Sequence, residues 1–280
     1  MASVQSQVRS LLKPLLFKFL GPQGYSWFQY YGKVKDIEQR LVEEPEMVLL
    51  PHLLGDSSVA IDVGANYAYY TVRMAQLSTQ GKVFAFEPIP FTHQVCKKII
   101  EKFRLNNVAL FQLGVGESEQ TLTFEVPIQK AGSISAGQAH MGGRNNKRAG
   151  KEKYHPFDKV QTFECKVISI DKFLPDLKRV DFIKIDIEGA ELFALKGMKG
   201  ILSKFKPALL IECCPFMFEG FGIKEIDLKN FIEEAGYETF ALEPSSKRLV
   251  PHLTTLVDGN YILLHRERLK DYKEILHHDS

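Results

Sequence analysis

Apolar runs and helix-like patterns alternate along most of the chain. Short runs rich in Val, Ile and Phe are typical of buried strands, and the stretches between them repeat apolar residues every three or four positions, as helices do. The alternation predicts an α/β domain with a mainly parallel, seven-stranded sheet and crossover helices. The predicted strands cover residues 58–63, 82–87, 108–113, 180–186, 207–213, 236–241 and 259–264. The predicted helices lie near residues 67–78, 91–105, 189–203 and 224–235.

Two further stretches alternate apolar and polar residues but have no helical pattern beside them. Residues 121–126 and 162–168 are therefore predicted to form an added β-hairpin that flanks the sheet. The last predicted strand, 259–264, is expected to be an antiparallel edge strand. These elements define a single domain over residues 55–266, followed by a polar C-terminal tail at 267–280.

The first 54 residues are predicted to form a helical extension. Apolar residues recur there at helical spacing with basic residues between them, and four aromatic residues follow. The apolar positions are Val8, Leu11, Leu12, Leu15, Leu16 and Phe19, the basic ones are Arg9, Lys13 and Lys18, and the aromatic ones are Trp27, Phe28, Tyr30 and Tyr31. This pattern indicates a helix packed on the domain or on a second subunit, and a peripheral contact with a membrane interface is the alternative.

Composition limits the possible functions. A chain of 280 residues that is 45% hydrophobic can bury one large core, and a net charge of +2 creates no global field that would recruit nucleic acid. The four cysteines, Cys96, Cys165, Cys213 and Cys214, lack metal-ligand spacing and are expected to be reduced core thiols. The chain has neither a convincing secretory signal nor an apolar run of about 18 residues, which predicts a cytoplasmic protein.

The segment 59–71 runs from a buried strand through a tight turn into a helix. Such a turn presents backbone N–H groups and the positive end of the helix to a nucleotide. A pyrophosphate site would need Gly-x-Gly-x-x-Gly, whereas here Gly64 is followed by Asn66 and Ala68. Asp62 would repel a pyrophosphate but attract the ammonium group of S-adenosylmethionine (SAM). Glu87, at the end of the next strand, is placed to accept hydrogen bonds from ribose hydroxyls.

Three motifs together resemble the FkbM family of SAM-dependent methyltransferases. They are Ile-Asp-Val-Gly-Ala-Asn-Tyr-Ala-Tyr-Tyr-Thr at 61–71, Phe-Glu-Pro at 86–88 and Lys-Ile-Asp-Ile-Glu-Gly-Ala-Glu at 184–191. The resemblance covers roughly residues 58–242 and implies a class I methyltransferase fold, which is Rossmann-like, with methyl transfer to a hydroxyl of a sugar or secondary metabolite. The chain departs from the family pattern at Ala68 and Gln120, where the family usually has glycine.

The resemblance also implies which residues bind SAM. Asp62, Gly64 and Asn66 are expected at its methionine end, Glu87 at its ribose and Glu117 near its adenine. The complete expected set is Asp62, Gly64, Asn66, Tyr67, Thr71, Glu87, Pro88, Gly116 and Glu117.

Candidate catalytic residues lie at the end of the fourth predicted strand. Methyl transfer to a hydroxyl needs alignment of the reactants and a group that removes the acceptor's proton. Lys184, Asp186 and Glu188 alternate there, which would place all three on one face of an extended chain. Asp186 and Glu188 are the candidate bases, and Lys184 would hold one of these carboxylates or that of SAM. With Glu212 the acids would alternatively bind a divalent cation, although a metal-free site is the preferred prediction.

The least regular segment, residues 129–159, is rich in glycine and in basic residues. It is predicted to be either a mobile lid or a solvated loop. A lid would cover the acceptor, and its basic residues would suit an acidic acceptor. His140 and His155 lie within it as further possible bases. Few aromatic residues interleave with its basic ones, which argues against a nucleic-acid partner.

Together these features predict a SAM-dependent O-methyltransferase of a small hydroxylated acceptor, acting as a monomer or homodimer. Two alternatives stay open at this point. One is a noncatalytic SAM-binding or scaffold protein with a degenerate site, and the other is an NAD-dependent oxidoreductase.

Overall fold

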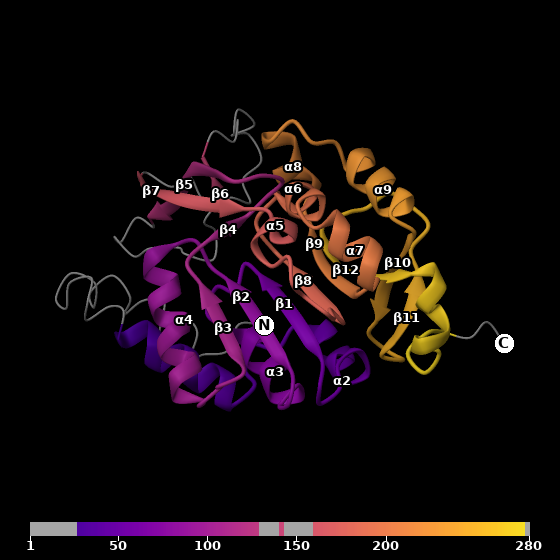
Figure 1. Ribbon diagram of the computed structural model, residues 1–280, viewed down its shortest axis with the longest axis horizontal. Helices are drawn as coiled ribbons and strands as arrows, with labels where there is room; N and C mark the ends of the chain where they lie inside the picture. The colour runs from indigo at the N-terminus through magenta and orange to yellow at the C-terminus, as the bar shows by residue number, and fades with distance from the viewer. Residues whose placement is uncertain (1–26, 129–139, 143–158, 278–280) are drawn as a thin grey trace.

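An eight-stranded, mostly parallel sheet forms the centre of the computed structural model, which describes residues 27–128, 140–142 and 159–277 (Figure 1). Five neighbouring strands pair in parallel, as the alternation of strands and helices predicts. In spatial order the strands are β11 (Arg248–Pro251), β10 (Tyr237–Glu243), β12 (Gly259–His265), β9 (Ala208–Cys213), β8 (Phe182–Ile185), β1 (Val59–Val63), β2 (Lys82–Phe86) and β3 (Val108–Phe111).

Both faces of this sheet are buried, so its central strands are apolar at nearly every position. Ile61 and Val63 of β1 face one hydrophobic core, and Ala60 faces the other. The first core is covered by α6 (Glu191–Lys196), α7 (Lys199–Phe205) and α9 (Glu225–Glu234). The opposite face is covered by α2 (Leu50–Leu53), α3 (Tyr69–Leu77) and α4 (Pro90–Lys102). Shorter elements are η1 (Pro45–Leu49), α5 (Ile170–Phe173), α8 (Pro215–Gly220) and η3 (Arg266–Tyr272).

The predicted β-hairpin is part of a second sheet. Its strands β5 (Gln120–Ile128) and β7 (Lys159–Ile168) pair antiparallel, which confirms the prediction, and β4 (Gly114–Val115) and β6 (His140–Met141) flank them. Phe124, Val126 and Cys165 bury a small core beneath this sheet. Figure 1 shows the second sheet near the end of β3, beside the main sheet.

The prediction that the last strand lies at the sheet edge is wrong. β12 is antiparallel, but it lies between β9 and β10 and pairs with both. Its residues 261–265 are all buried, which an edge strand would not achieve. The sheet edges are instead β3 and β11, the latter being a short strand that the sequence pattern did not predict.

The single helix predicted over 189–203 is also wrong, because α6 and α7 are separate. The Gly197 carbonyl accepts hydrogen bonds from the Ser169 hydroxyl at 2.8 Å and the Asp171 N–H at 3.1 Å, rather than from the following turn. The Asp171 carboxylate in turn accepts from the Gly200 and Ile201 N–H groups that begin α7. Hydrogen bonds with Ser169 and Asp171, which lie outside both helices, therefore end α6 and start α7.

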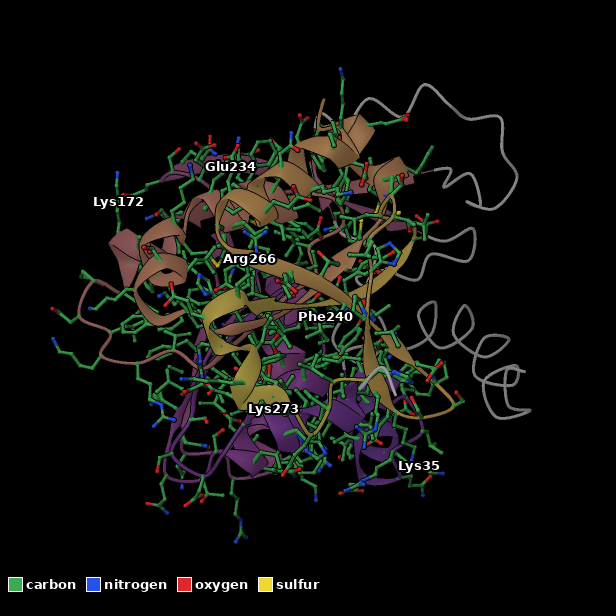
Figure 2. The ribbon with its side chains drawn as sticks, turned by 90° about the vertical axis from the view of Figure 1, so that its right-hand side faces the viewer. Lys35, Lys172, Glu234, Phe240, Arg266 and Lys273 are labelled. Carbon is green, nitrogen blue, oxygen red and sulfur yellow. The ribbon has the colours of Figure 1, made fainter. Side chains whose placement is uncertain are left out.

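The predicted polar tail is not free of the core. Tyr272 in η3 and Ile275 after it are buried in the same core as Phe240. Figure 2 shows Phe240 inside the fold, whereas Lys35 and Lys172 project outward. All four cysteines are buried and free, as predicted. Within the described ranges no helix is long and apolar enough to cross a bilayer.

Candidate functional site

The carboxyl ends of four central strands meet around one cavity of about 180 Å³. This is where ligands bind in open α/β sheets. A larger hollow of about 320 Å³ lies between the helix at 27–38 and α3, away from these strand ends, so volume alone does not identify the site. The polar residues that line the cavity at the strand ends are Asn66, Glu87, Asp186, Glu188 and Glu212.

Gly64 follows β1 at the point where the end of β8 approaches most closely. Its φ is +82°, and a Cβ placed there would lie 2.0 Å from the carbonyl oxygen of Asp186. The Gly64 carbonyl accepts a hydrogen bond from Lys184 Nζ at 3.2 Å. A side chain at position 64 would therefore push β1 and β8 apart at the site.

The turn after Gly64 contains two further left-handed residues, Asn66 with φ of 46° and Ala68 with φ of 63°. Ala68 precedes α3 and does not belong to it, which corrects the start of the helix predicted near residues 67–78. The left-handed region of φ favours glycine, so the backbone conformation at position 68 explains why the family usually has glycine there. Here a fully buried alanine is held in that conformation.

Glu87 organises this turn from β2. Its Oε2 accepts from the Asn66 N–H at 2.9 Å and its Oε1 from the Ile89 N–H at 3.0 Å. Burial raises the pKa of Glu87 to about 7, although these backbone hydrogen bonds lower it. Each oxygen retains a second lone pair for a ligand, and the residue lines the cavity.

We expect this buried carboxyl group to make SAM affinity depend on pH. If ribose hydroxyls donate to Glu87, as the sequence predicts, they favour its ionised form, and SAM affinity should then rise as pH increases through about 7. About one unit below that pKa only about a tenth of the group is ionised, and affinity should be about tenfold weaker. Calorimetry across this range measures the effect.

Glu87→Gln is the matched control for that measurement, because it keeps the shape and removes the titration. The ammonium of SAM titrates near 8 in either protein. The variant should bind more weakly than the parent above pH 7, with no inflection near that pH. An identical pH profile in both proteins would rule out Glu87 as the titrating group.

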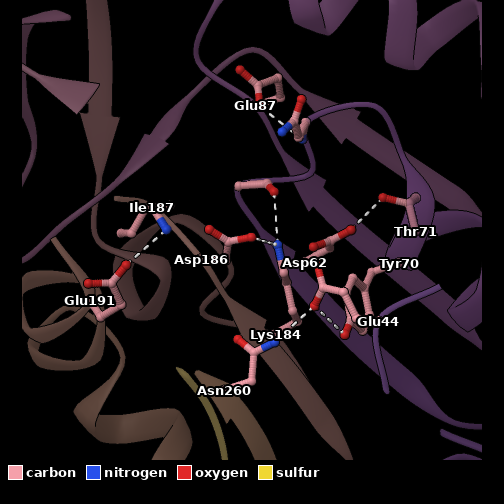
Figure 3. A network of polar contacts seen from close by, with 12 residues as sticks. Glu44, Asp62, Tyr70, Thr71, Glu87, Lys184, Asp186, Ile187, Glu191 and Asn260 are labelled. Carbon is pink, nitrogen blue, oxygen red and sulfur yellow. Dashed lines mark hydrogen bonds and ion pairs between the residues drawn. The ribbon is translucent and has the colours of Figure 1, made fainter. Parts of the chain in front are cut away.

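Asp62 is fully buried in β1 and accepts a hydrogen bond from the Thr71 hydroxyl at 2.5 Å, which ties the strand to α3 (Figure 3). Burial raises the pKa of Asp62, against the opposing charge of Lys184. Within the described residues its Oδ1, like Asn66 Oδ1, is buried without a hydrogen-bond partner. One oxygen acceptor in β1 and one in the turn after it could therefore be satisfied by a donor group, and of these two residues only Asn66 lines the cavity.

Lys184 and Asp186 form the central ion pair, with Nζ and Oδ2 2.9 Å apart (Figure 3). Burial alone would raise the pKa of Asp186, but the Lys184 charge and hydrogen bonds from Lys184 and Glu212 bring it below its ordinary value. Burial and the Asp186 charge instead raise the pKa of Glu212 to about 9. These opposite shifts favour the state in which Asp186 is ionised and Glu212 holds the proton of their shared hydrogen bond.

Glu188 reaches the cavity by a route that the alternation did not predict. β8 ends at Ile185, and Glu188 has a left-handed φ of 57°, so the extended chain does not continue to it. Glu191 Oε1 accepts from the N–H groups of Ile187 at 2.9 Å and Gly189 at 3.3 Å, and this stabilises the turn. The prediction of one extended face for Lys184, Asp186 and Glu188 is wrong, yet both acids line the same cavity.

Of the remaining residues that the sequence predicts to bind the cofactor, only one lines the cavity. Pro88 lines the cavity beside Glu87. The Tyr67 ring is buried and lies under Lys33 Nζ, 4.6 Å from the ring centroid. Gly116 donates its N–H to a carbonyl group of β7, and Glu117 Oε2 lies 4.0 Å from Lys196 Nζ. Neither residue is among those that line the cavity.

Sequence reasoning missed three residues beside the ion pair. Glu44 Oε2 accepts from the Tyr70 hydroxyl at 2.9 Å and from Asn260 Nδ2 at 3.1 Å, as Figure 3 shows. Tyr70 is a helix residue and the other two are remote in sequence, so no motif connects them. Glu44 belongs to the segment before the first strand and is not among the residues that line the cavity.

The predicted lid over 129–159 falls almost wholly outside the described residues, as does His155. For the ranges that are described, no group of three or more His, Cys, Asp or Glu side chains has an arrangement suited to a metal ion.

Comparison with known proteins agrees with the sequence motifs. The family described as "Methyltransferase FkbM domain" matches residues 62–239. Methyltransferase 1 of Beauveria bassiana (strain ARSEF 2860) is 29% identical over 166 residues, which are 57% of this chain and 66% of that protein. Methyltransferase sdnD of Sordaria araneosa is 29% identical over 158 residues, 49% of this chain and 59% of that protein. The chain thus spans less than two thirds of either curated relative.

Among solved structures, a methyltransferase FkbM from Methylobacillus flagellatus KT is similar with a TM-score of 0.47 and 18% identity. The similarity covers 85% of this chain and 59% of that one.

Proposed function

Because the chain belongs to the methyltransferase FkbM domain family, we propose that it is a SAM-dependent O-methyltransferase that modifies a hydroxyl of a small acceptor, such as a sugar or a secondary metabolite. The observation that carries the proposal is the cavity at the strand ends, where Glu87, a carboxyl group suited to ribose, and Asn66, with an unpaired acceptor, lie beside Asp186.

The residues around the turn fit SAM. The buried Asp62 Oδ1 and Asn66 Oδ1 lack partners in the described part of the chain, and the ammonium group of SAM is a donor that would suit both oxygens and would complement the charge of an ionised Asp62. Glu87 would accept from the ribose hydroxyls, and the nucleoside would extend toward Pro88 and the neighbouring hollow at Val115. When bound, SAM supplies a methyl group on a positively charged sulfur.

The acidic residues supply proton removal. Transfer of the methyl group to the acceptor oxygen would break its bond to sulfur and leave S-adenosylhomocysteine. The oxygen must then lose its proton, which a carboxylate within reach would take. Asp186 and Glu188 both line the cavity and are the candidates. Lys184 holds Asp186 through their ion pair and keeps it ionised.

The proposal is tested with methyl-labelled SAM and a library of hydroxylated acceptors. We expect label transfer to oxygen with formation of S-adenosylhomocysteine, and we expect it to survive EDTA, because the carboxylates act as bases and not as metal ligands. Activity that returns only with Mg²⁺ would overturn the metal-free mechanism. Tight SAM binding without label transfer to any acceptor would favour a noncatalytic protein, and a thermal shift with NAD but not SAM would favour an oxidoreductase.

A further inference from the structure

The helix at residues 27–38 carries a cluster of aromatic side chains on its exposed side. Trp27 is 49% exposed and Tyr31 is 64% exposed. Their ring centroids are 5.9 Å apart in a stacked arrangement, and Tyr30 meets both rings edge-on at 5.6 and 5.1 Å. Aromatic side chains in mutual contact form a rigid apolar patch, with polar N–H and O–H tips at its rim.

A cation from a different element completes this cluster. Lys98 Nζ of α4 lies 4.0 Å from the centroid of the Trp27 ring. The nearby Lys102 pairs with Glu38 at 3.8 Å, so that acid is partly neutralised. Figure 1 shows the helix at 27–38, in indigo, beside α4. We call Trp27, Tyr30, Tyr31 and Lys98 the aromatic patch.

The sequence directly before the aromatic patch indicates what covers it. Residues 1–26 contain Arg9, Lys13 and Lys18 but no Asp or Glu, and their apolar residues recur at helical spacing. A net positive, amphipathic sequence that leads into exposed Trp and Tyr is the combination that binds the interface of anionic membranes. A dry contact between two protein copies would instead deplete lysine from its centre.

We propose that the aromatic patch is a peripheral contact with an anionic lipid bilayer. Trp27 and Tyr31 insert their rings at the level of the lipid headgroups, where amphipathic aromatic side chains are enriched. Lys98 faces the negative headgroups. This contact does not depend on the reaction at the strand ends, because none of its four residues lines the cavity there.

Trp27 is the only tryptophan of the chain, so its fluorescence reports on the patch directly. The full chain is titrated with vesicles of phosphatidylcholine containing about one third phosphatidylserine. We expect a blue shift of the emission, quenching by lipids brominated on their acyl chains, and weaker binding at high salt. Vesicles of phosphatidylcholine alone should bind about tenfold more weakly, since they lack the negative surface.

Two variants and a matched control test the assignment. Lys98→Ser should weaken binding to the anionic vesicles by about fivefold, the effect of removing one basic residue near the surface. Tyr31→Ser should reduce binding to both kinds of vesicle while leaving Trp27 as the reporter. Leu253→Ser changes the most exposed large apolar residue of the described ranges, at 83%, and should have no effect.

Three results would overturn the proposal. One is binding to vesicles, detected by sedimentation, without quenching of Trp27, because the contact would then lie elsewhere. Another is an equal loss of binding in Leu253→Ser. The third is an emission shift that depends on protein concentration and not on vesicles, which would make the patch an interface between copies of the chain.

Discussion

Replacing Gly64 with alanine should abolish SAM binding and lower the free energy of unfolding by about 2–5 kcal/mol. The added Cβ would lie 2.0 Å from the Asp186 carbonyl oxygen and 3.0 Å from Ile187 Cγ2, and φ of +82° is unfavourable for alanine. The first neighbour is backbone, which cannot swing aside, so β1 and β8 would have to separate. Their separation would also displace the Gly64 carbonyl from Lys184.

Gly222→Ala is the matched control for this change. Gly222 has a similar φ of +71°, but a Cβ there would meet nothing within 4 Å. It should therefore show only the cost of the left-handed conformation, about 1–2 kcal/mol, with SAM affinity retained. Chemical unfolding and calorimetric titration measure both quantities. If Gly64→Ala were as mild as Gly222→Ala in both measurements, close approach of β1 and β8 would not explain the glycine.

Part of this site could be predicted from the sequence alone. Because both faces of the sheet are buried, the strands appear as apolar runs, and the acids at their ends mark the cavity. Glu87, Asp186 and Glu188 could thus be selected from position alone, and all three line it. The sequence places Gly64 in the tight turn, but the steric reason for a glycine there is the end of β8, where Lys184 lies 120 residues further along the chain.

What the sequence could not predict depends on tertiary contacts. The break between α6 and α7 follows from hydrogen bonds to Asp171 and Ser169, and an uninterrupted apolar repeat conceals it. The place of β12 inside the sheet depends on which strands it pairs with, and periodicity carries no such information. Glu44 and Asn260 are 216 residues apart in the sequence, so only the folded chain brings them into hydrogen-bond contact.

One of the two candidate bases should prove essential for turnover. Asp186→Asn or Glu188→Gln should lower kcat by about 10²–10⁴-fold, the usual contribution of a positioned proton acceptor, with much less effect on SAM affinity. An amide has nearly the same shape as a carboxylate but cannot accept the proton. Single-turnover rates with labelled SAM, together with calorimetric affinities, separate chemistry from binding.

Glu212→Gln makes the same kind of change in the same cavity and serves as the control. Its pKa is raised to about 9 by burial and by the Asp186 charge, so at neutral pH it is already protonated and donates to Asp186. An amide N–H can replace that donor, and the single-turnover rate should fall by less than about tenfold. A loss equal to that of Asp186→Asn would mean that the Glu212 carboxyl group itself is needed for the reaction, and not only as a donor to Asp186. If Asp186→Asn and Glu188→Gln both kept the parental rate, neither carboxylate would be the proton acceptor, and the base would have to lie outside this cavity wall.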